Sequence, residues 1–284
     1  MPSGFLERLI SGRWIAGPSA SDAIRRAKQL NALNERAIIN FLGEEFTDKE
    51  RVINALHEYL GLISSIKQSG VKADISLKPT QLGLRIGYAY AAKNYAKVLR
   101  KARTTGVFVW LDMESSDTVS STIAMYRRAL VSGEGAAQIG ICLQAYLRRT
   151  QNDIRSLVNT KAVIRLVKGA YKENAKLAFQ KRQDISKNYL VLMRYLFKNY
   201  EAFTIASHDR AIIAEAEALN RAYQKQVTYA FLSGIRPKLA KEMATKGEQV
   251  SVYVPYGKLW LDYAYRRIRE QGHTMLVLRS LFGG

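Results

Sequence analysis

Cysteine is almost absent from this chain of 284 residues, and Cys142 is the only one. No disulfide can form within the chain, which fits a reducing compartment such as the cytoplasm. Histidine is also scarce: His57, His208 and His273 lie far apart, and there is no H-x-x-E-H motif or cysteine cluster. Protein metal sites usually need such grouped ligands, so we predict no metal site.

Long hydrophobic runs are missing as well. No stretch approaches the roughly 20 apolar residues that a membrane-spanning helix needs. The N-terminus, "MPSGFLERLISGRWIAG", carries scattered charges in place of the apolar centre of a signal peptide. Only five prolines occur, and no low-complexity linker marks a domain boundary. We expect a single-domain cytoplasmic protein, soluble or peripherally associated with the inner face of the cell membrane.

Acidic residues are few: 24 Asp and Glu stand against 44 Lys and Arg, for a net charge of +20. A surface this basic attracts polyanions. The segment between Arg85 and Asp112 has no acidic residue and carries Lys93, Lys97, Arg100, Lys101 and Arg103. It is either a solvated helix face or a contact for an anionic membrane or a partner protein. No nucleic-acid-binding motif with interleaved aromatic residues is present, so we expect no nucleic acid partner.

Eight apolar, β-branched runs recur along the chain, of which 48% is hydrophobic. The runs are 36–44, 73–79, 106–114, 137–146, 162–171, 202–209, 226–234 and 249–257. Continuous apolar runs are typical of parallel strands that are buried on both faces. Because helical patterns separate the runs, the sequence predicts an α/β fold, a (βα)8 barrel. We assign residues 1–35 to an N-terminal helical segment and residues 36–284 to the barrel.

Four segments between these runs have helical patterns. In residues 81–102, Leu84, Tyr88, Ala91 and Tyr95 fall on one stripe. Residues 115–130 open with Ser and Asp, which suit a helix N-cap, and residues 209–224 are rich in good helix formers. Residues 172–199 predict one long helix or two shorter ones.

Polar and ionisable residues gather where the apolar runs end. They are Lys78, Asp112, Glu114, Gln144, Arg165, Lys168, His208, Asp209, Tyr253 and Tyr256. In a (βα)8 barrel the carboxyl ends of all strands meet at one face, where active sites lie. Since a buried charge without a partner is costly, this pattern predicts a charged, ligand-filled mouth. Lys78 and Asp112, on adjacent strands, are natural ion-pair partners.

Local motifs leave the chemistry open. Arg165, Lys168 and Gly169 could hold a phosphate or polarise a ring system, but they form neither a Walker loop nor a dinucleotide fingerprint. The adjacent residues Ser207, His208 and Asp209 cannot form a hydrolase relay. In "YAYRRIRE", Tyr263, Arg266 and Arg267 share one side of a helix. They form either a solvated face or a clamp for a small carboxylate.

Taken together, several motifs resemble the proline dehydrogenase family over roughly residues 10 to 270. They are "NFLGEEFTD", "SLKPTQLG", "VWLDMESSDT", "LQAYLRRTQND", "RLVKGAYKE", "YVPYG" and "WLDYAYRRIRE". The resemblance implies a distorted TIM-type barrel with a C-terminal helix over its mouth. It also implies FAD as cofactor, oxidation of L-proline to Δ1-pyrroline-5-carboxylate, and transfer of electrons to a membrane quinone.

The resemblance assigns roles to individual residues. Arg266 and Arg267 would bind the proline carboxylate beside Lys78, with Tyr253 and Tyr263 also at the substrate. Asp112 would anchor the polar network, and Arg165 would lie near the flavin N5. Residues expected to contact FAD are Met113, Gln144, Arg165, Val167, Lys168, Gly169, Ala170, Ser207 and His208. At Ser207 the family more often has threonine, and a hydroxyl is kept.

Two other functions stay open at this point. One is a flavin barrel enzyme that acts on a related cyclic amino acid. The other is a basic, non-catalytic binding module, which the net charge motivates. An oligomer is compatible with either.

Overall fold

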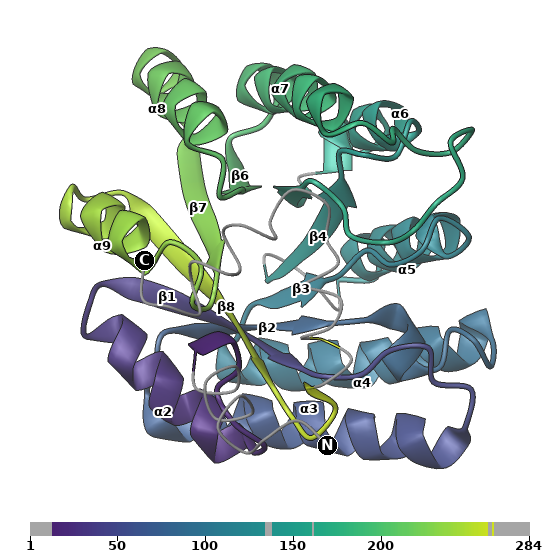
Figure 1. Ribbon diagram of the computed structural model, residues 1–284. Helices are drawn as coiled ribbons and strands as arrows, with labels where there is room; N and C mark the ends of the chain where they lie inside the picture. The colour runs from purple at the N-terminus through teal and green to yellow at the C-terminus, as the bar shows by residue number, and fades with distance from the viewer. Residues whose placement is uncertain (1–12, 134–137, 161, 261–262, 264–284) are drawn as a thin grey trace, which may run out of the picture.

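The computed structural model describes residues 13–133, 138–160, 162–260 and 263. Eight parallel strands form one closed barrel in chain order, which confirms the predicted (βα)8 architecture (Figure 1). The strands are β1 (Glu35–Phe41), β2 (Ala73–Leu77), β3 (Val109–Leu111), β4 (Ile139–Gln144), β5 (Val163–Val167), β6 (Ala202–Ala206), β7 (Gln226–Leu232) and β8 (Gln249–Tyr256). The barrel closes where β1 pairs with β8, in a register that runs from Glu35 opposite Val250 to Phe41 opposite Tyr256.

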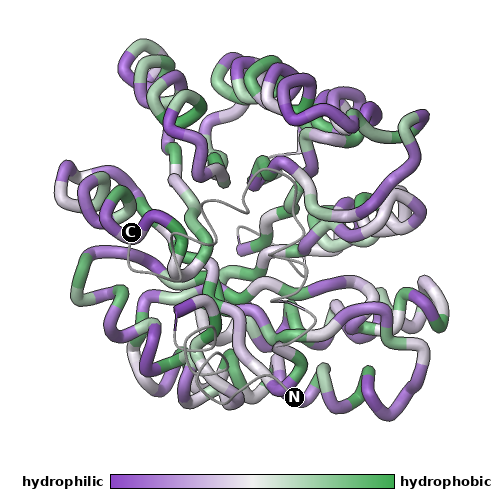
Figure 2. Tube along the Cα trace, in the orientation of Figure 1, coloured by the Kyte–Doolittle hydropathy of each residue, from purple (hydrophilic) through white to green (hydrophobic). Residues whose placement is uncertain are grey.

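Helices surround the strands. They are α2 (Ala20–Asn31), α3 (Lys49–Ser69), α4 (Tyr88–Thr105), α5 (Val119–Val131), α6 (Thr150–Arg155), α7 (Arg182–Asn199), α8 (Arg210–Tyr223) and α9 (Pro237–Thr245), with 3-10 turns η1 (Pro79–Leu82) and η2 (Val158–Thr160). Figure 2 shows apolar residues concentrated along the strands and hydrophilic residues on the outer helix surfaces. In the predicted N-terminal helical segment, α2 starts at a capping box between Ser19 and Asp22.

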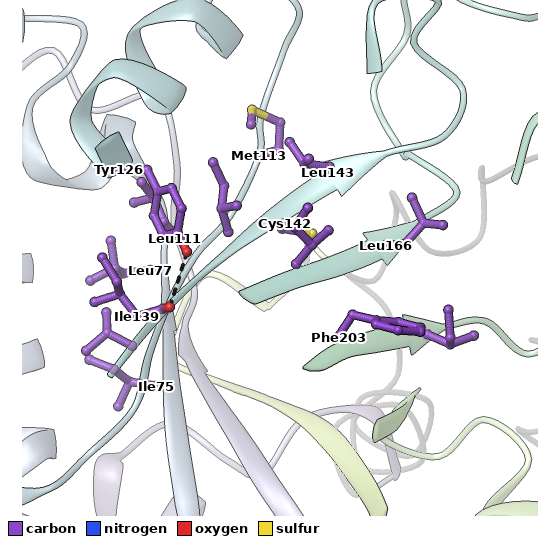
Figure 3. Packing of buried hydrophobic residues seen from close by; sticks show 14 of the residues in the cluster. Ile75, Leu77, Leu111, Met113, Tyr126, Ile139, Cys142, Leu143, Leu166 and Phe203 are labelled. Carbon is purple, nitrogen blue, oxygen red and sulfur yellow. Dashed lines mark hydrogen bonds between the residues drawn. The ribbon is translucent and has the colours of Figure 1, made fainter. Parts of the chain in front are cut away.

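The layer between strands and helices is the main core. Ile75, Leu111, Ile141 and Leu166 are completely buried there, and Figure 3 shows some of these side chains packed with Tyr126 and Phe203. The Tyr126 hydroxyl donates to the carbonyl of Ile139 over 3.3 Å, which ties α5 to β4. Such tyrosine anchors satisfy a buried hydroxyl while keeping an aromatic ring in the core.

Three predicted helix boundaries are wrong. α4 begins at Tyr88, not at residue 81, because Gly83 adopts a φ of +98° and interrupts the helix before it. The N-cap of α5 is Thr118, because Asp117 is drawn into an ion pair with Arg85. The segment from 172 to 181 is irregular, and only α7 of the predicted long helix forms.

Candidate active site at the barrel mouth

Asp112 is the centre of a buried polar cluster at the carboxyl ends of the strands. Its carboxylate accepts hydrogen bonds from Ser76 Oγ at 2.7 Å, from the Tyr253 hydroxyl at 2.9 Å and from Arg165 Nη2. The donors come from β2, β8 and β5 respectively. The structure thus brings together three of the predicted site residues, Asp112, Arg165 and Tyr253.

Arg165 carries its charge deep inside the barrel, where only 3% of the residue is exposed. Its guanidinium lies 4.9 Å from the Trp110 ring centroid and 5.5 Å from that of Tyr253. Burial by itself would lower the pKa of Arg165, but Cys142 and Asp112 beside it raise that pKa above the usual value. The guanidinium is therefore positively charged. One side is satisfied by Asp112 and Ser76, while Nη1 is buried with no hydrogen-bond partner among the described residues.

Lys78 follows β2 and is 7% exposed. The expected ion pair between Lys78 and Asp112 is wrong, because Arg165 from β5, two strands away from β3, pairs with that carboxylate. Within the described part of the chain, Lys78 has no ion pair of its own, although its charge acts on Glu114. A buried ammonium in this position is suited to bind an anionic ligand group.

Glu114 connects three loops of the mouth. Its completely buried carboxylate accepts hydrogen bonds from the Thr80 backbone at 2.9 Å and from Thr80 Oγ1 at 2.6 Å. Thr80 Oγ1 in turn accepts the backbone N–H of Glu45 at 2.8 Å. Burial raises the pKa of Glu114 to about 7. The carboxyl group is therefore partly protonated at neutral pH.

A Glu114→Gln variant should change how stability depends on pH. The pKa of Glu114 is raised from 4.5 to about 7 in the folded protein. The folded state therefore binds the proton more tightly than the unfolded state does, and the unfolding free energy is highest below pH 4.5 and falls as the pH rises through 7. Between about pH 5.5 and about pH 8 the wild type should lose about 2 kcal/mol of unfolding free energy to this group. Glutamine imitates the protonated acid, so the variant should lose correspondingly less. Urea unfolding at both pH values measures this, and equal losses in both proteins would contradict it.

The ends of β4 and β5 place the predicted cofactor residues side by side. Gln144 Nε2 donates to the Glu114 carbonyl at 2.8 Å, and Lys168 Nζ lies 3.1 Å from both Asp209 and Ser186. Val167 and Ala170 are half-buried, and Met113 belongs to the hydrophobic core. Gly169 has a φ of +109°, and an added Cβ would lie 2.1 Å from the Tyr146 ring.

The next strand places Ser207 and His208, both buried, beside this cluster. His208 Nε2 accepts the backbone N–H of Leu232 at 2.9 Å, which fixes the orientation of the imidazole. Ser207 Oγ accepts the N–H of Asp209 at 3.2 Å, and Asp209 caps α8. The His208 imidazole and the Ser207 hydroxyl are thus bonded to backbone N–H groups, whereas the Asp209 carboxylate pairs with Lys168.

Several residues of the mouth had no role in the sequence analysis. Ser76 lies two positions before Lys78, and Trp110 lies two positions before Asp112. Side chains two positions apart on a strand point to the same face, so this spacing could have identified both residues. Tyr171 donates to Glu44 Oε2 at 2.9 Å, and burial raises the pKa of its hydroxyl. Tyr256, in contrast, lies outside the site, because its hydroxyl donates to Glu58 of α3.

Of the predicted carboxylate clamp, Tyr263 is described and is 5% exposed. It packs with Trp14, Ile15, Leu42 and Ile235 in a small cluster. Arg266 and Arg267, and the helix expected to cover the mouth, lie outside the described residues. No group of three His, Cys, Asp or Glu side chains suited to a metal ion occurs in the described ranges. Nor, within those ranges, does any helix have the length and apolar character needed to cross a membrane.

Comparison with known proteins decides the family. A family model described as "Proline dehydrogenase" matches residues 23–279. The chain belongs to the proline dehydrogenase family. "Proline dehydrogenase 1" of Bacillus subtilis (strain 168) is 35% identical over 280 residues, which cover 96% of this chain and 91% of that protein. "Proline dehydrogenase" of Deinococcus radiodurans is 32% identical over 267 residues, which cover 92% and 86%.

Solved structures agree on the fold of this proline dehydrogenase family member. Proline utilization A (PutA) from Bdellovibrio bacteriovorus, inactivated by N-propargylglycine, superposes with a TM-score of 0.88 at 21% identity over 99% of the chain. A proline utilization A structure with proline bound in remote sites gives 0.81 at 17% identity over 95%. The chain spans about a third of the length of these solved proteins, 35% and 32%.

Proposed function

We propose that this chain oxidises L-proline to Δ1-pyrroline-5-carboxylate with FAD as cofactor and a membrane quinone as electron acceptor. Family membership supports an enzyme of this kind. The observation that carries the proposal is Arg165, a charged guanidinium that Asp112 holds at the mouth while Nη1 is buried and unbonded within the described chain. A buried donor without a partner is costly, and an acceptor on a bound ligand would satisfy it.

The residues of the mouth fit FAD. Arg165 would donate to the electron-accepting part of the flavin, and Gln144 would lie along the same ring system. Lys168 and the backbone at Gly169 would hold the ribityl and phosphate groups, with Ser207 and His208 toward the adenosine. When bound, FAD supplies the acceptor for the hydride that leaves the carbon next to the proline nitrogen.

The remaining residues bind and orient the substrate in this proposal. Lys78, Arg266 and Arg267 would bind the proline carboxylate, because guanidinium and ammonium groups are strong partners for carboxylates. Tyr253 and Tyr263 would pack against the ring. Since Asp112 holds Arg165 in place with help from Ser76, the charge is already oriented before substrate arrives, which lowers the cost of reorganisation during the reaction.

An anaerobic titration of the purified, FAD-loaded protein tests the proposal. L-proline should bleach the flavin absorbance, and D-proline should leave it unchanged. A protein that takes up no FAD would overturn the cofactor assignment and favour a basic binding module. A yellow protein that is bleached by hydroxyproline or pipecolate, but not by L-proline, would show an enzyme for a related cyclic amino acid.

A further inference from the structure

The described chain begins with a short segment, residues 13–17, that lies at the barrel mouth before α2 starts. The N–H of Ala16 donates to the carbonyl of Pro255 at 2.9 Å, and the N–H of Gly257 donates to the carbonyl of Gly17 at 2.9 Å. Both contacts are at the carboxyl end of β8, where the candidate active site is located. We call residues 13–17 the mouth segment.

A second set of contacts joins the mouth segment to the loop after β7. The Ser233 hydroxyl donates to the carbonyl of Arg13 at 3.0 Å. Gly234 has a φ of +77°, and a Cβ added there would lie 2.6 Å from Arg13 O and 2.8 Å from Trp14 Cδ1. Because glycine alone leaves this space free, the position of Trp14 depends on Gly234.

Trp14 belongs to a small apolar cluster that also contains Tyr263. The cluster is separate from the main core, and its buried members come from four distant parts of the chain. They are Trp14, Ile15, Leu42, Ile235 and Tyr263, each at most 6% exposed. Since Trp14 has the largest side chain among them, its replacement by a smaller residue would leave a space beside the others.

Tyr263 in turn lies close to the polar cluster of the mouth. Burial raises the pKa of Tyr253, and the nearby Asp112 and Tyr263 raise that pKa further. The Tyr253 hydroxyl donates to Asp112 at 2.9 Å, and its carbonyl accepts the N–H of Ser233 at 3.0 Å. The mouth segment is therefore packed against the part of the structure that holds both tyrosines.

We infer that Trp14 is a positioning residue, which holds Tyr263 against the ring of the bound amino acid substrate. The inference rests on the proposed function, in which Tyr263 packs on that ring. An apolar contact of this kind differs little between the bound substrate and the transition state. Its loss should therefore raise KM and leave kcat nearly unchanged.

Steady-state kinetics of the full, FAD-loaded chain with a soluble acceptor test the inference. Trp14→Leu should raise KM for L-proline about 10-fold, whereas kcat should stay within about twofold of wild type. Trp14→Phe keeps an aromatic ring and should recover most of the lost affinity. Phe197→Leu is the matched control, because Phe197 is buried in α7 against Phe203, and it should change neither constant.

Binding of tetrahydrofuran-2-carboxylate, a five-membered ring acid without an amine to oxidise, measures affinity in the absence of turnover. Perturbation of the flavin absorbance should give a dissociation constant about 10-fold higher in Trp14→Leu. Gly234→Ala displaces Trp14 without replacing it and should raise both this constant and KM, which tests the inference even if Trp14→Leu does not fold. Gly106→Ala, at a φ of +78° with open space beside it, should raise neither.

Three results would overturn the role of Trp14. They are an unchanged KM in both Trp14→Leu and Gly234→Ala, a rise of equal size in Phe197→Leu, and a loss of kcat with KM unchanged, which would show a purely structural effect. Failure of the proposed function would appear in the wild type, as a protein that takes up no FAD or is not reduced by L-proline, and the inference would fall with it. A wild type that is reduced normally, with variants that match it, would refute the inference alone.

Discussion

An Arg165→Met variant should lose at least 100-fold in kcat/KM for L-proline and about 3–5 kcal/mol of unfolding free energy. The stability loss is expected because Asp112 would remain buried with its cationic partner removed. The activity loss is expected because the buried Nη1 is the donor that we assign to the flavin. Steady-state kinetics with a soluble acceptor and urea unfolding measure the two effects.

Because one variant changes both quantities, a second is needed to separate them. In Arg165→Met/Asp112→Asn the buried pair becomes neutral, and much of the lost stability should return while the activity stays low. Arg36→Met is a control for the loss of a different ion pair, since Arg36 pairs with Asp74 at 2.6 Å near the amino ends of β1 and β2. It should lower stability and leave proline turnover unchanged. If the double variant recovers both stability and activity, Arg165 has only a structural role.

Gly169→Ala should be the second severe change, at about 3 kcal/mol or more. A φ of +109° strains any residue that has a Cβ, and the new methyl group would lie 2.1 Å from the Tyr146 ring. Tyr146 is held in place, because its N–H donates to Lys168 O and its carbonyl accepts from Phe179, both at 2.8 Å. Relief of the clash should shift the Lys168–Gly169 loop and reduce FAD affinity. Urea unfolding and flavin titration test both expectations.

Two comparisons isolate the steric part of that cost. Gly106 has a φ of +78° with no atom near the position of an added Cβ, so Gly106→Ala should cost only about 1 kcal/mol. In a Tyr146→Ala background, the cost of Gly169→Ala should fall toward that of Gly106→Ala. Equal costs for the two glycine replacements in the wild-type background would contradict the proposed contact.

The sequence was informative about the barrel because each buried parallel strand needs a continuous apolar run. Seven of the eight predicted runs contain a whole strand of the closed sheet, and the first contains all of β1 except Glu35, which had been assigned to the N-terminal helical segment. Helix starts were less predictable, because they depend on contacts from distant segments. Asp117 looked like a cap but is bound by Arg85, and Ser116 donates its N–H and hydroxyl to Glu173.

The sequence predicted where the site residues lie better than it predicted which of them pair with one another. Strand ends identified Lys78, Asp112, Arg165 and Tyr253 as neighbours in a mouth, and the motifs supplied the family. Which residue would neutralise Asp112 depends on the barrel's diameter and on side-chain length, neither of which a linear pattern contains. Arg165 crosses the interior where Lys78, one strand away, does not.

The cluster around Asp112 also has a consequence for the order of folding. Tyr253 lies 141 positions from Asp112 in sequence, and it is part of the strand that closes the barrel. A nascent chain that ends before β8 can bury Asp112 and Arg165 only in an incomplete sheet with open edges. Contacts between such distant segments form late, because the chain must first give up the entropy of a long loop. The polar cluster at the mouth should therefore form last, and the proposed cofactor should bind only after the barrel has closed.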